Sequence, residues 1–89
     1  MSKGDGARIS QGLLKLMMRL PALRGELQVI HGHDLSLRDL AEAYDEASRT
    51  LTELRADPGC DRKLLREYEI VCAEIEGDVV KLCAAWRLL

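Results

Sequence analysis

The sequence is poor in the residues on which strands and disulfide-bonded folds depend. It has no Phe, one Trp, two Tyr and two Pro in 89 residues. Its three cysteines include no CxxC pair, which excludes a disulfide framework and gives no recognisable zinc-ligand spacing. No long apolar run is present, because Lys15 and Arg19 interrupt the most hydrophobic stretch. We therefore expect a reduced, cytoplasmic protein that does not associate with membranes.

The composition that remains favours helices. Hydrophobic residues make up 47% and charged residues 31% of the chain, which is typical of a folded domain and not of a disordered segment. A chain of this length forms one domain with a thin core. We expect residues 1–7 to form a flexible tail and residues 8–89 to form a single helical domain.

Three apolar stripes with steps of three and four residues predict three helices, over residues 8–31, 36–55 and 61–89. The stripes are Ile9, Leu13, Leu16, Leu20, Leu23, Leu27 and Ile30; Leu37, Leu40, Tyr44, Ala47, Leu51 and Leu54; and Leu65, Tyr68, Cys72, Ile75, Val79, Leu82, Trp86 and Leu89. The two connections are short, so helices that follow one another should run antiparallel. The predicted fold class is an all-α antiparallel three-helix bundle that completes its thin core by dimerisation.

Pro21 lies inside the first stripe. It removes a backbone donor and disfavours helical geometry at Leu20, so the helix is either kinked or broken there. The stripe keeps its phase across Pro21, which favours a kinked but continuous helix.

The helix ends carry recognisable residues. Gly32 is suited to a left-handed residue after the first helix, and Asp34 or Ser36 to the cap of the second. Asp61 is the predicted cap of the third helix, and Gly77 could permit a neighbouring helix to approach closely.

His31, His33 and Asp34 form the one cluster with metal-ligand residue types, but no fourth ligand has a suitable spacing. The end of the first predicted helix and the cap of the second are enough to explain the presence of these three residues. We therefore predict no metal, cofactor or catalytic residue. A small all-α enzyme with a site between subunits is a weaker alternative, and no motif supports it.

The first and third predicted helices carry more apolar residues than a bundle seam needs. A lone monomer would expose some of them, whereas a homodimer or another protein would cover them. A wide internal seam is the third possibility. We predict an interaction module, a homodimeric regulator, adaptor or chaperone, whose dimer or partner interface contains Leu14, Met17, Met18, Val80, Cys83 and Trp86.

Basic residues concentrate near the N-terminus. In residues 1–25, five basic side chains face one acidic side chain, although the whole chain has a net charge of −2. The basic residues either pair with acidic neighbours inside the fold or contact an external anion. The second possibility gives the alternative function, a nucleic-acid-binding bundle with contacts from Arg8, Lys15, Arg19 and Arg24.

Overall fold

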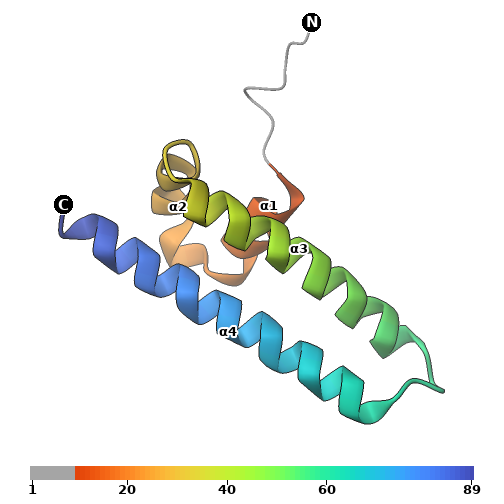
Figure 1. Cartoon of the computed structure of the whole chain (residues 1–89). Coiled ribbons are helices and arrows are strands. Elements are labelled where there is room, and N and C mark those ends of the chain that lie inside the picture. Colours follow the sequence, from red (N-terminus) through yellow and green to blue (C-terminus); the bar gives the residue numbers. More distant parts are fainter. Residues whose placement is uncertain (1–9) are drawn as a thin grey trace, which may run out of the picture.

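The computed structural model describes residues 10–89, which are helical and contain no strand. Four α-helices and one short 3-10 turn follow one another, and this confirms the predicted helical class (Figure 1). The predicted tail of residues 1–7 lies outside the described residues. The elements are α1 (Gln11–Arg19), η2 (Pro21–Leu23), α2 (Arg24–His31), α3 (Leu35–Ala56) and α4 (Arg62–Arg87).

Three helices begin at a side chain that accepts hydrogen bonds from the free backbone N–H groups of the first turn. Ser10 Oγ accepts from the Leu13 N–H of α1 at 3.0 Å. Asp34, not Ser36, caps α3, and Asp61 caps α4 as predicted. The α3 and α4 bounds therefore lie within two residues of the prediction.

The first predicted helix is divided, so the expectation of a continuous kinked helix was wrong. Leu20 has φ −124° and ψ 65°, outside the helical region, because the ring of Pro21 crowds it. Pro21 then opens the 3-10 turn, where its fixed φ fits and its missing N–H costs nothing. The chain turns between α1 and α2 instead of forming one rod, and this replaces the predicted three helices by four.

The end of α2 also differs from the prediction, because Gly32 has φ −73° and is not left-handed. The free carbonyl groups at this helix end have another partner. Arg38 Nε donates to the His31 carbonyl at 2.9 Å, and its Nη2 donates to the Gly32 carbonyl at 3.2 Å. A side chain from α3 therefore satisfies the helix end that a left-handed glycine was expected to close.

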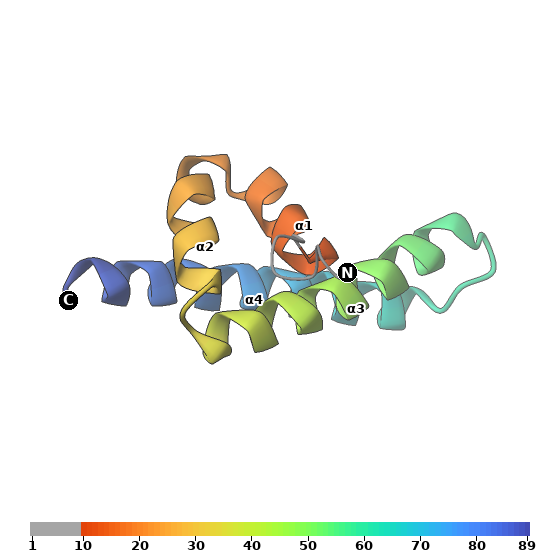
Figure 2. The same ribbon diagram turned by 90° about the horizontal axis from the view of Figure 1, so that it is seen from above.

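The four helices form two layers. α3 and α4 form an antiparallel hairpin, and α1 and α2 form an arch that lies on one side of it (Figure 2). This arch lies behind the hairpin in Figure 1. Among residues 10–89, no element covers the opposite side of the hairpin.

A glycine permits the closest approach between the layers. A Cβ atom added to Gly12 would lie 1.8 Å from the Ala41 carbonyl oxygen, so only glycine fits at this position of α1. Gly77, the position predicted to permit a close approach, has no other heavy atom within 4 Å of an added Cβ. The structure therefore assigns this role to Gly12.

The core lies where the arch meets the hairpin and extends between α3 and α4, and it is aliphatic apart from Tyr44 and two thiols. Leu16 and Ile75 of the predicted stripes are buried, whereas Leu40 is half-buried. No described helix is long and apolar enough to cross a membrane. The buried apolar residues are Leu13, Leu16, Met17, Leu27, Ile30, Leu37, Ala41, Tyr44, Ala47, Leu51, Cys72, Ile75, Val79 and Cys83.

Candidate interaction surfaces

Two of the six predicted interface residues belong to the core. Met17 is 3% and Cys83 is 1% exposed, so neither offers a side chain to a partner. Met17 of α1 and Cys83 of α4 both belong to the buried core cluster. The interface prediction is corrected for these two residues.

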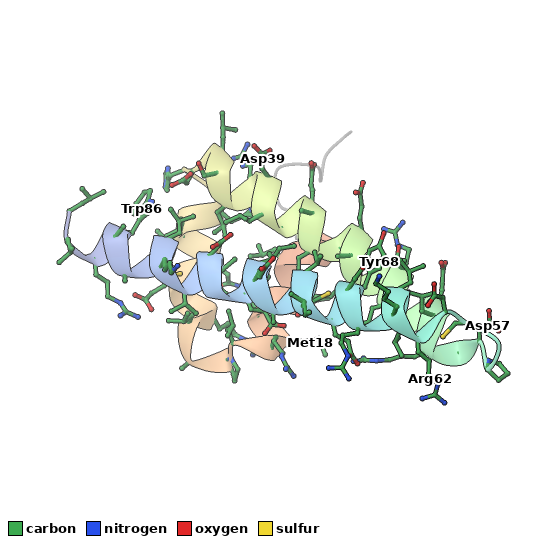
Figure 3. The ribbon with its side chains drawn as sticks, turned by 60° about the horizontal axis from the view of Figure 1, so that its bottom comes forward. Met18, Asp39, Asp57, Arg62, Tyr68 and Trp86 are labelled. Carbon is green, nitrogen blue, oxygen red and sulfur yellow. The ribbon has the colours of Figure 1, made fainter. Side chains whose placement is uncertain are left out.

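The other four predicted interface residues reach the surface but do not gather at one site. Leu14 and Met18 lie one turn apart on α1, and Met18 is 68% exposed. Val80 is exposed on α4, and Trp86 is half-buried near the end of that helix. Figure 3 shows Met18 and Trp86 well apart.

Two predicted anion contacts are paired within the fold. Lys15 Nζ donates to Asp45 Oδ1 at 2.7 Å and to Ser48 Oγ at 3.0 Å. Arg19 Nε lies 3.3 Å from Glu76 Oε2. Arg24 is exposed, and Arg8 lies outside the described residues. Binding of a phosphate by Lys15 or Arg19 would therefore compete with a carboxylate that is already in place.

These ion pairs attach α1 to both helices of the hairpin. The hydrogen bond from Lys15, followed by that from Arg49, lowers the pKa of Asp45 below its ordinary range. On α4, Glu76 also accepts a hydrogen bond from the Tyr44 hydroxyl at 2.6 Å. Burial, followed by this contact with Glu76, raises the pKa of Tyr44. The arrangement orients α1 across the hairpin.

Trp86 occupies the corner where α2, α3 and α4 meet. Its indole Nε1–H donates to Asp34 Oδ2 at 2.8 Å, and its ring stacks on His33 with 6.5 Å between centroids. The hydrogen bond from Trp86 lowers the pKa of Asp34. Since Asp34 also caps α3, one carboxylate joins the end of α4 to the start of α3.

A small groove of about 320 Å³ lies beside Trp86, between α2 and the end of α4. Its apolar lining comes from Val29, Ile30 and Trp86. At its edge, Arg87 Nε and Nη2 donate to the two carboxylate oxygens of Glu26 at 2.6 and 2.9 Å. This ion pair lowers the pKa of Glu26 and fixes the end of α4 to α2.

His31, His33 and Asp34 lie where one helix ends and the next begins, as predicted. Asp34 is the α3 cap and His31 is the last residue of α2. Burial, followed by the charge of Arg38, lowers the pKa of His31. Within residues 10–89, no group of three His, Cys, Asp or Glu residues could hold a metal ion.

The side of the hairpin opposite the arch carries an apolar strip, which we call the open face. Contacts with the arch mark the covered flank of each helix: Ala41 and Asp45 in α3, Glu76 and Arg87 in α4. Residues on the other flank form the strip, with the buried Ala47 and Ile75 at its floor. The strip consists of Leu40, Ala43 and Leu54 of α3 and Leu64, Tyr68, Val71 and Leu82 of α4.

These apolar side chains are partly accessible to solvent. Leu64 is 39% and Val71 is 38% exposed, whereas Leu40, Leu54, Tyr68 and Leu82 are half-buried. In Figure 3 this side of the hairpin is uppermost, so Tyr68 and Asp39 lie above and Met18 lies below. An apolar strip bordered by polar residues is a surface on which an amphipathic helix can pack.

Acidic residues border the open face along both helices, and we call them the acidic rim. The sequence contained the signal for this feature, because Asp39, Glu46 and Glu53 recur every seven residues. Sequence reasoning does not place these residues beside an uncovered apolar strip, since the stripes do not tell which side of a helix the fold leaves uncovered. The rim consists of Asp39, Glu42, Glu46 and Glu53 of α3 and Glu67, Glu74 and Asp78 of α4.

The described part of the chain is thus an arch-and-hairpin helical fold with an uncovered apolar strip. Comparison with protein-family models, with curated proteins and with solved structures found no match.

Proposed function

We propose that the protein is a non-enzymatic interaction module that binds a helix of another protein in the open face of its hairpin. The single observation behind this proposal is the uncovered strip between α3 and α4, where Leu64 is exposed near the turn and Val71 two turns further along α4. A helix laid on the strip would bury these side chains against its own apolar face. On α3 the strip runs from Leu40 to Leu54, or about 21 Å, which is enough for about four turns of a partner.

The contacts of the arch with the hairpin support the same proposal. The arch braces the hairpin from behind through Gly12 and Ala41, and through the pairs Lys15–Asp45 and Arg19–Glu76. A surface that is already formed binds with a smaller loss of conformational entropy than one that must be assembled. The arch therefore acts as a support, and the opposite side of the hairpin acts as the binding surface.

The experiment uses three synthetic amphipathic peptides of the length of α3. All have the same leucine seam, and their flanks carry Lys, Gln or Glu. We expect at least one peptide to bind in isothermal titration calorimetry. The Val71→Glu variant should weaken that binding by about tenfold or more, because it places a charge in the strip.

Val80→Glu is the matched control. Val80 is also an exposed valine of α4, at 44%, but nine residues from Val71 it lies on the opposite side of the helix, on the flank that carries Glu76 and Arg87. The control should keep the affinity of the original protein, and circular dichroism should show equal helicity for both variants. Failure of all three peptides to bind, or equal loss in both variants, would contradict the proposed function.

A second candidate function, self-association through α1, has support from one observation. Leu14 and Met18 lie one turn apart, and both are exposed, 39% and 68% respectively. Leu14 and Met18 are the two residues of the predicted homodimer interface that are exposed next to each other on one helix. Its test is given in the Discussion.

A further inference from the structure

The carboxylates of residues 10–89 divide into two equal groups. One group has partners within the fold: Glu26, Asp45, Glu69 and Glu76 are in ion pairs, and Asp34, Asp57 and Asp61 accept hydrogen bonds at helix ends or in the turn. The other group is the acidic rim. Within the described residues, none of its seven carboxylates has an ion pair or a side-chain hydrogen bond.

This division follows the two sides of the hairpin. The paired carboxylates lie on the flank that faces the arch or at the helix ends, whereas the unpaired ones border the open face. Arg49 lies beside the rim but is paired with Asp45. Arg38, one turn from Glu42, donates to two backbone carbonyls at the end of α2, and Lys63 and Lys81 lie on the outer side of α4. These four basic residues are fewer than the seven carboxylates. The open face therefore carries a net negative border.

We propose that the open face selects a basic amphipathic helix of another protein, with an apolar seam and with Lys or Arg on both flanks. This inference rests on the proposed function and names the chemistry of the partner. The seam of such a helix would cover Leu64, Tyr68 and Val71. Its basic flanks would lie beside the rows Asp39–Glu46–Glu53 and Glu67–Glu74, where opposite charges favour both encounter and register.

A second copy of the chain fits this surface poorly. Two open faces brought together would place one acidic rim against another, and juxtaposed like charges disfavour association. Nucleic acids and anionic membranes are disfavoured for the same reason. The basic residues of α1 do not neutralise the acidic rim, because Lys15 and Arg19 are paired on the covered flank.

The three peptides described above test the charge preference. We expect the Lys peptide to bind about tenfold more tightly than the Gln peptide, and the Glu peptide to bind more weakly than both. Added salt should weaken the Lys peptide and have little effect on the Gln peptide, because exposed charges are screened. Equal affinity for the three peptides would overturn this inference and leave the proposed function intact.

Two charge reversals, two residues apart on α4, show which flank of the helix causes the preference for a basic peptide. Glu67→Lys reverses a charge on the rim and should weaken the Lys peptide by about fivefold. Glu69→Lys makes the same change in net charge, but Glu69 faces the other flank, where it lies 3.3 Å from Arg55. It should change the affinity by less than about twofold. Equal weakening by both variants would show attraction to overall charge alone and would overturn the inference.

Discussion

Gly12 of α1 lies directly against the backbone of Ala41 in α3. A Cβ atom at Gly12 would be 1.8 Å from the Ala41 carbonyl oxygen and 2.5 Å from its carbonyl carbon. Backbone atoms cannot move aside as the end of a flexible side chain does, so α1 itself would have to shift. The Gly12→Ala variant should lower the free energy of unfolding by about 3 kcal/mol or more, measured by urea denaturation.

The matched control for this change is Gly77→Ala in α4. The space around Gly77 is open, and alanine has the higher helix propensity, so this variant should gain about 1 kcal/mol of stability. Opposite effects of the same substitution would separate close packing from helix propensity. A neutral Gly12→Ala variant would contradict the observed contact between α1 and α3.

Trp86→Phe tests the corner between α2, α3 and α4. The variant keeps an aromatic ring but loses the indole N–H that donates to Asp34. The pKa of Asp34 should then rise toward the ordinary range of an aspartic acid, as carboxyl resonances in an NMR titration would show.

The same variant predicts a pH dependence of stability. The pKa of Asp34 is lowered in the folded protein, so its contribution to stability is present above the pKa of the unfolded state and is lost as the pH falls through the folded-state pKa. The stability difference between Trp86→Phe and the original protein should therefore be larger at about pH 7 than at about pH 2. A difference that does not change with pH would assign the effect of Trp86 to packing alone.

Tyr44→Phe tests the link between α3 and α4. The change removes the hydroxyl that donates to Glu76 at 2.6 Å and keeps the buried ring. We expect a loss of about 1 kcal/mol in the free energy of unfolding, since Glu76 retains Arg19 as a partner. In Glu76→Gln the same tyrosine change should cost less, and additive effects of the two substitutions would contradict the coupling.

The homodimer predicted from the sequence is tested on α1. If Leu14 and Met18 form its interface, the double variant Leu14→Glu/Met18→Glu should convert a dimer into a monomer, measured by light scattering, without loss of helicity. Val71→Glu, on the open face, should leave that dimer intact. A monomeric original protein, or an unchanged mass in the double variant, would eliminate self-association through α1.

Much of the helical organisation could be predicted from apolar spacing and helix caps. The stripes and Asp61 placed α3 and α4 within two residues of their observed ends. The sequence did not decide between a kinked helix and two separate helices at Leu20. Leu20 and Leu23 both pack against the core, so the apolar stripe keeps its phase through the break. Periodicity describes which side of a helix is apolar, but not whether the helix axis continues.

The surfaces were harder to predict than the helices. Met17 and Met18 are adjacent and chemically identical, yet one is 3% and the other 68% exposed. The difference depends on where the arch lies relative to the hairpin, and one helix alone does not contain this information. For the same reason the sequence shows the spacing of the acidic rim but not its position at the border of an apolar strip.

The two buried cysteines make it possible to measure how often α4 separates from the rest of the fold. Cys72 and Cys83 are shielded in α4, and burial raises the pKa of both thiols, so the reactive thiolate is scarce while the helices remain packed. An alkylating reagent can modify them at an appreciable rate only when α4 separates from its neighbours. Cys60, half-buried in the turn, supplies the reference rate within the same molecule. Labelling kinetics thus follow the transient detachment of α4 without any added probe.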